Sequence, residues 1–242
     1  MLRPKMGPQG DLMKNRTPQS KMIPSRATSR IIIVDDHPIL REGLAQLIDQ
    51  QKDLSVCGQF AEAARAFDAL VSLKPDLALI DISLKGSSGV ELVKNIKAHY
   101  PKLLVLVLSM HDESLYAERV LRAGGRGYVM KQEGGKKLME AIRQVLNGKT
   151  YVSERISAKI FDLFSGRLTE SSSPVERLTD REFEVFRLIG QGLSTKQIAE
   201  KLRVSAKTVE VHRVNIKQKL KVATAAELIH FAVRWMDSQS RT

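Results

Sequence analysis

Ile31-Ile32-Ile33-Val34-Asp35-Asp36 places two carboxylates directly after four large apolar residues. A short, wholly apolar run of this kind is typical of a strand that is buried on both faces of a parallel sheet. The arrangement recurs at Leu77–Ile80, which precedes Asp81, and at Leu103–Leu108, which precedes Ser109. The pattern predicts a buried sheet whose strands end in polar groups.

Strand-like and helix-like segments alternate five times between residues 31 and 146. The expected strands are Ile31–Val34, Leu54–Gln59, Leu77–Ile80, Leu103–Leu108 and Gly127–Met130. The expected helices are Pro38–Gln50, Ala61–Leu73, Gly89–His99, Asp112–Arg122 and Gly135–Leu146. This alternation predicts an α/β fold, here a flavodoxin-like, doubly wound, five-stranded parallel sheet.

The polar residues at the strand ends should form one site, because the carboxyl ends of the strands make the binding crevice of an open α/β sheet. The expected members are Asp35, Asp36, Asp81, Ser109 and Lys131. Carboxylates packed this closely repel one another unless a cation joins them, and Mg²⁺ suits an oxygen-only site. A single Asp at a strand end is more often a turn former or a helix cap. The Mg²⁺ prediction therefore depends on all five residues occurring in this order at the strand ends, and not on any one of them.

Residues 175–236 show no strand-like alternation and predict an all-α domain of four helices. Their helix starts carry the capping pairs Thr179 with Glu182, Ser194 with Gln197 and Thr224 with Glu227, and the single cap Ser205. Only three residues separate the expected helices Thr195–Leu202 and Ala206–Leu220. That spacing is typical of a helix-turn-helix.

The second of these helices divides into two faces at 100° per residue. Val209, His212, Ile216 and Leu220 share the expected core face. The opposite face carries Lys207, Glu210, Val211, Val214, Gln218 and Lys221. Exposed valines on a polar face fit contact with thymine methyl groups in a major groove, and the alternative is partial burial against the preceding helix. Lys207 and Lys217 lie nearer the flanks and are expected to contact phosphates.

The residues from Arg30 to Lys149 resemble the receiver domain of two-component response regulators, most clearly at Gly127-Tyr128-Val129-Met130-Lys131 and at Gly89, eight residues after Asp81. The resemblance implies that Asp81 accepts a phosphoryl group from a sensor histidine kinase. It also implies that Asp35, Asp36, Asp81 and the backbone carbonyl of Ser83 hold Mg²⁺. Ser109 and Lys131 would contact the phosphoryl group, and Tyr128 would be a switch residue that moves inward. Lys85 departs from the family pattern, which usually has proline there.

The residues from Leu178 to Leu220 resemble the LuxR-type helix-turn-helix, through Leu178-Thr179-x-Arg181-Glu182, Gly192-Leu193-Ser194, Lys196-x-Ile198-Ala199, Lys207-Thr208-Val209-x-x-His212 and Lys219-Leu220. With the receiver in front, the chain resembles a NarL/FixJ-type response regulator. This implies a transcription factor rather than an enzyme. It would bind double-stranded DNA and form a homodimer when phosphorylated, with the last helix, Thr224–Met236, as one candidate dimer surface. The expected DNA-binding residues are Thr195, Lys196, Ser205, Lys207, Thr208, Glu210, Val211, Val214 and Lys217.

Four segments follow from these patterns: a disordered basic tail (1–29), the receiver domain (30–149), a linker with a short helix (150–174) and the helix-turn-helix domain (175–242). The formal net charge of +12 lies mainly in the tail and the last segment, which suits a polyanionic partner. The single Cys57 excludes a disulfide within the chain and fits a cytoplasmic protein. No apolar run approaches the roughly 20 residues of a membrane span.

Three other functions remain open at this point. An aspartyl-phosphate hydrolase needs a partner carboxylate two positions after its nucleophile, whereas Asp81 is followed by Ile82 and Ser83. A second alternative keeps the DNA-binding role with a receiver that goes unphosphorylated in the cell, and the complete acid set argues against it. A basic helical domain can also bind RNA or another protein, which competition with duplex DNA would reveal.

Overall fold

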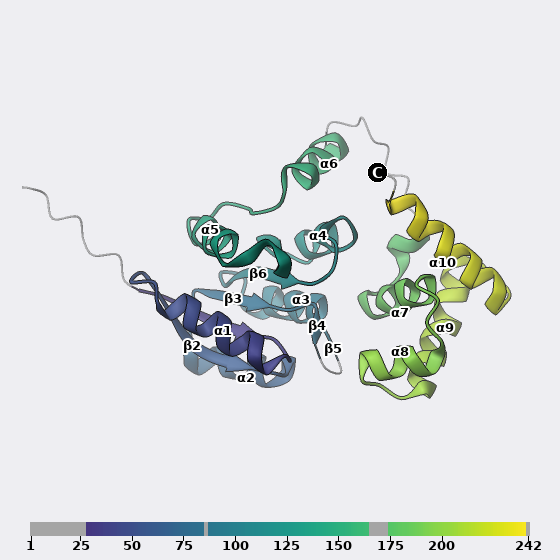
Figure 1. Ribbon diagram of the computed structural model, residues 1–242, viewed down its shortest axis with the longest axis horizontal. Helices are drawn as coiled ribbons and strands as arrows, with labels where there is room; N and C mark the ends of the chain where they lie inside the picture. Colours follow the sequence, from purple (N-terminus) through teal and green to yellow (C-terminus); the bar gives the residue numbers. More distant parts are fainter. Residues whose placement is uncertain (1–27, 85–86, 165–173, 241–242) are drawn as a thin grey trace, which may run out of the picture.

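The computed structural model describes residues 28–84, 87–164 and 174–240. The predicted tail lies outside the described residues except for its last two, and so do Lys85 and residues 165–173 of the predicted linker. The chain forms an α/β half, from β1 to α5, and a helical half, from η2 to α10, that lie beside each other (Figure 1).

The α/β half contains a five-stranded parallel sheet in the order β2-β1-β3-β6-β7. Its strands are β1 (Ser29–Val34), β2 (Leu54–Phe60), β3 (Leu77–Ile80), β6 (Leu104–Ser109) and β7 (Gly127–Met130). Val34 pairs with Ile80, and Ile80 pairs with Val107, so these neighbouring strands end at the same level. The flavodoxin-like prediction is confirmed, and the polar residues that follow these strands lie on one edge.

Helices cover both faces of the sheet (Figure 1). On one face are α1 (Pro38–Asp49) and α5 (Gly134–Leu146), and on the other are α2 (Ala63–Leu73), α3 (Gly89–His99) and α4 (Glu113–Arg122). Ile31 and Ile33 pack with the first pair of helices, whereas Ile32 and Val34 pack with the others. Because both faces are covered, every position of β1 must be apolar, which explains the unbroken run in the sequence.

A short antiparallel ribbon, β4 (Ser83–Leu84) and β5 (Ser87–Ser88), follows β3 and was not predicted. It ends at Gly89, the first residue of α3. A Cβ at this position would lie 2.1 Å from the backbone oxygen of Asp81 and 2.7 Å from Cα of Ile82. Glycine is therefore required for the close approach of α3 to the end of β3.

The helical half follows α6 (Glu154–Phe164) and contains the short helix η2 (Pro174–Arg177) and the helices α7 (Asp180–Gly190), α8 (Thr195–Leu202), α9 (Ala206–Leu220) and α10 (Ala225–Ser240). The predicted bounds of α8 and α9 are confirmed. Thr179, Ser194 and Ser205 each accept a hydrogen bond from a backbone N–H in the first turn of their helix, and Thr224 accepts one from the N–H of Glu227. These caps explain where the four helices begin.

The helix α7 joins the two halves, because it lies between α10, α9 and the α/β half (Figure 1). Its described side chains from Asp180 to Ile189 are buried, including the charged Arg181, Glu182, Glu184 and Arg187. The Asp180 carboxylate forms ion pairs with Lys94 on α3 at 2.8 Å and with Arg119 on α4 at 3.3 Å. The charged side chains of α7 are therefore covered by neighbouring elements of the same chain and do not face solvent.

Candidate acid site and nucleic-acid interface

Acidic side chains from β1 and β3 meet a lysine from the end of β7. Asp35 and Asp81 are almost fully buried, and Nζ of Lys131 lies 2.8 Å from Oδ2 of Asp35 and 3.0 Å from Oδ2 of Asp81. One ligand atom from each of Asp35, Asp36, His37 and Asp81 lies within 4.8 Å of each of the others. The structure thus brings together the carboxylates and the ammonium that the sequence predicted.

The acid site favours an added cation. Burial raises the pKa of Asp81, the Lys131 ammonium opposes that shift, and the Asp35 carboxylate adds to it. Oδ1 of Asp36 and Oδ2 of Asp81 are buried and make no hydrogen bond with any described residue, although His37 Nδ1 and Lys131 Nζ lie 3.0 Å away. Hard carboxylate oxygens with open coordination positions are suitable ligands for Mg²⁺. The residues present therefore fit that ion.

Ser109 and Tyr128 are connected through the backbone of His111. The Ser109 hydroxyl is buried and accepts the N–H of His111 at 3.1 Å, while the Tyr128 hydroxyl donates to the carbonyl oxygen of His111 at 2.8 Å. Tyr128 is only 1% exposed. The sequence led us to expect that this ring moves inward on phosphorylation. In the structure the ring lies inside and its hydroxyl is hydrogen-bonded there, and the movement itself stays a prediction.

His111 is a member of the site that the sequence analysis missed. Its Nε2 lies 2.8 Å from the Ser83 hydroxyl, and its ring stacks on Tyr116 with the centroids 5.2 Å apart. Burial, and then the nearby Arg187, lower the pKa of His111 to about 3, so the ring is neutral at physiological pH. A lone histidine in a loop has no periodic pattern that would have marked it. Its only sequence signal is its place two residues after Ser109.

The helix α9 presents the two faces that its periodicity predicted. Val209, Ile216 and Leu220 are buried, whereas Val211 is 53% exposed and Val214 is 46% exposed. About half of the surface of each valine is therefore exposed and about half is covered, so these values do not exclude the alternative of partial burial.

The other predicted DNA-binding residues lie on α8, on α9 and in the turn between them. Lys196, Ser205, Lys207 and Glu210 are exposed, and Thr195, Thr208 and Lys217 are partly exposed. The Thr195 hydroxyl donates to Glu210 at 2.7 Å, and Ser205 caps α9 by accepting the N–H of Thr208 at 3.0 Å. These residues form one continuous surface around the turn.

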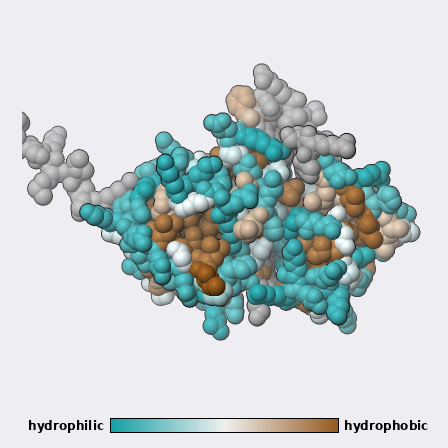
Figure 2. All heavy atoms as spheres, viewed as in Figure 1, coloured by the Kyte–Doolittle hydropathy of each residue, from teal (hydrophilic) through white to brown (hydrophobic). Residues whose placement is uncertain are grey.

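The face of the molecule in Figure 2 shows an apolar patch in each half. One lies over α1, where Ile39 is exposed beside a pocket of 740 Å³ between α1 and α5. The other follows α10, where Ile229 and Val233 are partly exposed. On this candidate dimer surface, Leu228 and Ala232 belong to the core, so only part of the helix is free for another molecule.

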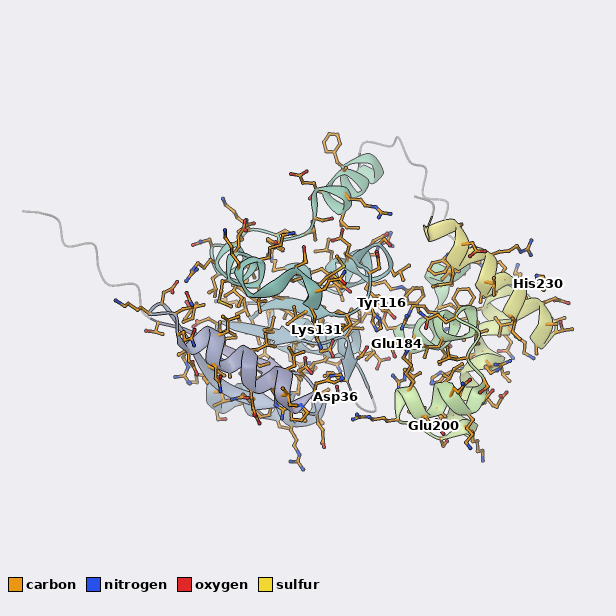
Figure 3. The ribbon with its side chains drawn as sticks, viewed as in Figure 1. Asp36, Tyr116, Lys131, Glu184, Glu200 and His230 are labelled. Atoms are coloured by element: carbon orange, nitrogen blue, oxygen red, sulfur yellow. The ribbon has the colours of Figure 1, made fainter. Side chains whose placement is uncertain are left out.

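The acid site opens toward the helical half across a cavity of 820 Å³ (Figure 3). The floor of the cavity includes Asp36 and Asp81, and its far side includes Arg187, Lys201 and Arg203. NH1 of Arg203 lies 3.0 Å from Oδ2 of Asp36. This ion pair links the helix-turn-helix turn to the acid site, and the sequence analysis did not predict it.

A second link between the halves is built around Arg119 of α4. Its guanidinium donates to the carbonyl oxygens of Val175 and Leu178 at 2.9 and 3.1 Å, and it lies 4.1 Å from the centre of the Phe183 ring. Phe183 in turn packs edge-on against Tyr116 and Trp235. Arg119 therefore attaches α4 to the start of α7.

Within the part of the chain that the structure describes, no helix combines the length and the apolar character that crossing a membrane requires.

Comparison with known proteins identifies the two halves. The model of the response regulator receiver domain matches residues 31–143, and that of the bacterial regulatory proteins of the luxR family matches residues 176–232. The chain is 35% identical over 210 residues to the oxygen regulatory protein NreC of Staphylococcus aureus strain MRSA252, covering 85% of this chain and 97% of the relative.

Two solved structures of RcsB are also similar. One is RcsB from Salmonella enterica serovar Typhimurium bound to the promoter rprA with the phosphomimetic BeF3-, with 28% identity, a TM-score of 0.56, and coverage of 85% of this chain and 98% of that one. The other holds two RcsB dimers on two parallel DNAs, with 29% identity, a TM-score of 0.52, and coverage of 84% and 97%. The chain thus belongs to the two-component response regulators that join a receiver domain to a LuxR-type DNA-binding domain.

Proposed function

We propose that phosphorylation of Asp81 by a sensor histidine kinase controls the binding of this response regulator to double-stranded DNA. The observation that carries the proposal is the buried Asp81 carboxylate, with Asp35 in the same cluster and the Lys131 ammonium 3.0 Å away. The Lys131 ammonium, together with a bound divalent cation, would offset the negative charge of an added phosphoryl group.

In the transfer, a carboxylate oxygen of Asp81 attacks the phosphorus of a phosphohistidine, the P–N bond breaks, and the electron pair of that bond leaves with the imidazole. Lys131 then pairs with an oxygen of the transferred group. Asp35, Asp36, Asp81 and the backbone carbonyl of Ser83 would hold Mg²⁺, which when bound neutralises charge on the transferring phosphoryl group. In this role the chain is a phosphorylated regulator and not an enzyme with its own substrate.

The effect of the phosphoryl group must also be transmitted to the helical half through a chain of contacts. Because Tyr128 is already inside, we place His111 at the start of that chain. A new acceptor oxygen near Ser109 would compete for its hydroxyl, which now accepts the N–H of His111. The His111 ring stacks on Tyr116, and Tyr116 packs on Phe183 of α7. A shift of His111 would therefore reach the contact between the two halves directly.

DNA is read by the surface around α8 and α9. The exposed Val211 and Val214 are placed to meet thymine methyl groups when α9 enters a major groove. Lys196, Lys207 and Lys217 would contact phosphates. Thr195, Ser205, Thr208 and Glu210 complete the surface. The relative RcsB has been seen as dimers on DNA. By analogy, this chain would bind as a homodimer when phosphorylated, and the exposed part of α10 is one candidate contact.

The proposal includes the location and the domain limits of the protein. The regulator acts in the cytoplasm, with a tail (1–29), a receiver domain (30–149), a linker (150–174) and a DNA-binding domain (175–242). The family models, which match residues 31–143 and 176–232, support these limits.

The test is phosphorylation of full-length protein by acetyl phosphate and Mg²⁺, followed by intact-mass measurement. Asp81→Asn should remove the acid-labile phosphoryl group, because an amide oxygen is a poor nucleophile. Asp68→Asn is the matched control, since Asp68 is exposed on α2 and is not one of the clustered acid-site residues. If Asp81→Asn still gains one acid-labile group at the wild-type rate, Asp81 is not the acceptor.

A further inference from the structure

We infer that Arg203 and a divalent cation compete for the Asp36 carboxylate, so that loading the acid site with Mg²⁺ detaches the helix-turn-helix turn from the receiver. The inference rests on the proposed role of Asp36 as a Mg²⁺ ligand. It assigns a new role to a residue of the DNA-binding domain, which occupies part of the metal site in the docked arrangement.

The contact itself is specific. NH1 of Arg203 lies 3.0 Å from Oδ2 of Asp36, a side chain that is only 8% exposed, while the Arg203 side chain is 50% exposed. The arginine therefore reaches from the edge of the cavity to a carboxylate that solvent hardly contacts. Oδ1 of the same carboxylate makes no hydrogen bond with any described residue. Asp36 thus has one oxygen paired with the helical half and one that lies 3.0 Å from Nδ1 of the neighbouring His37 without a hydrogen bond.

The position of Arg203 depends on the fold of the turn. Arg203 ends α8 in the left-handed conformation, with φ of 54°, and its N–H bonds back to the carbonyls of Ala199 and Glu200. This cap fixes the backbone from which the side chain extends toward the α/β half. Two residues later Ser205 caps the start of α9. The ion pair therefore holds the same turn that presents the DNA-reading helix.

The charges explain why the two cations exclude each other. Asp35, Asp36 and Asp81 supply three carboxylates within one small cluster, and Lys131 already pairs with two of them. Arg203 adds a second positive charge in the docked arrangement. A divalent ion in the cluster, together with Lys131, balances all three carboxylates without Arg203. Mg²⁺ binds carboxylate oxygens at roughly 2.0–2.1 Å, so it would lie within a few ångström of the guanidinium and repel it.

The receiver does not control DNA binding by covering α9. Val211 and Val214 remain exposed while the halves are docked, so the recognition face is not buried against the receiver. What the receiver holds is α7, through Arg119, Lys94 and Asp180, and the turn, through Arg203. A cation that releases the turn therefore acts on a contact other than the one between α4 and α7.

The inference is tested by Mg²⁺ titration of the full-length, unphosphorylated protein by calorimetry. Arg203→Asn removes the charge but keeps a residue that tolerates positive φ. It should bind Mg²⁺ about fivefold more tightly than the wild type, a coupling at the low end of the usual range between two sites. Arg203→Lys retains the charge and should bind Mg²⁺ more nearly as the wild type does. Arg234→Gln removes a charge from the exposed part of α10 and should leave the affinity unchanged.

A second variant separates docking from simple charge removal. Arg119→Ala breaks the contact between α4 and α7 but leaves Arg203 in place, so it should also tighten Mg²⁺ binding. If Arg203 acts through docking, the two changes together should give no more than the larger single effect. Trp235, the single tryptophan, packs on Phe183 at the contact between the halves, so Mg²⁺ should shift its emission in the wild type and much less in Arg119→Ala.

The outcomes are distinguishable. Equal Mg²⁺ affinity of wild type and Arg203→Asn, or an equal gain in Arg234→Gln, would overturn the competition while leaving the metal site intact. Additive gains from Arg203→Asn and Arg119→Ala would also overturn it, because the arginine would then act only through its charge. Absence of Mg²⁺ binding in every variant would overturn both the competition and the proposed metal site.

Discussion

Gly89→Ala should destabilise the receiver and impair phosphorylation of Asp81, although alanine is the better residue for a helix. The added Cβ would lie 2.1 Å from the backbone oxygen of Asp81, 2.7 Å from Cα of Ile82 and 2.9 Å from the carbonyl carbon of Asp81. All three neighbours are backbone atoms, so no side chain can rotate away. The end of β3 or the start of α3 must move.

The size of the effect follows from that overlap. Overpacking in a folded protein typically costs about 1–3 kcal/mol, and a backbone clash on this scale belongs at the upper end, about 3 kcal/mol. Gly43→Ala is the matched control. Gly43 is an exposed position inside α1, and nothing lies within 4 Å of its added Cβ. The same substitution there should stabilise the protein by about 0.5–1 kcal/mol through helix propensity and backbone entropy.

The assay is urea unfolding followed by far-ultraviolet circular dichroism and by Trp235 fluorescence, which reports on the helical half. The receiver transition of Gly89→Ala should move to lower urea, and that of Gly43→Ala to higher urea. Phosphorylation by acetyl phosphate should slow only in Gly89→Ala. Equal midpoints for Gly89→Ala and the wild type, or shifts of the same sign in both variants, would refute the close approach of α3 to Asp81.

Three further predictions concern the helical half. Val211→Ala or Val214→Ala should each cost about 1 kcal/mol of specific DNA affinity, measured on specific and scrambled duplexes, and should leave the thermal midpoint unchanged; a loss of stability instead would place the valines in the core. Lys207→Ala and Lys217→Ala should weaken binding to both duplexes and lower the salt slope by about one ion each, and an unchanged slope would exclude a phosphate contact. Burial raises the pKa of Glu184 to about 7, against the opposing Arg181, so its contribution to stability is complete below its ordinary pKa and is lost as the pH rises through 7. Glu184→Gln should therefore flatten the fall in thermal midpoint between about pH 5 and pH 8, and an unchanged slope would contradict the assignment.

The sequence alone was enough to predict the sheet, most helix bounds and the acid site, because each depends on local rules. A strand covered on both faces needs an unbroken apolar run, as in Ile31–Val34, and parallel strands must end on a common edge. Asp35, Asp81 and Lys131 therefore meet, because each follows the end of a strand in the same parallel sheet. The two faces of α9 followed in the same way from helical geometry. The caps at Thr179, Ser194 and Ser205 marked where helices begin.

The contacts between the two halves depended on the tertiary structure. Arg181, Glu184 and Arg187 have the polar character of a solvent-facing helix side, yet they are buried because α7 lies between the receiver and the other helices. Arg119 and Asp180 are far apart in the chain, as are Arg203 and Asp36. Hydrophobic periodicity detects burial driven by apolar area within one element. It carries no signal for ion pairs between distant elements, since these form only after both halves have folded and their surfaces have met.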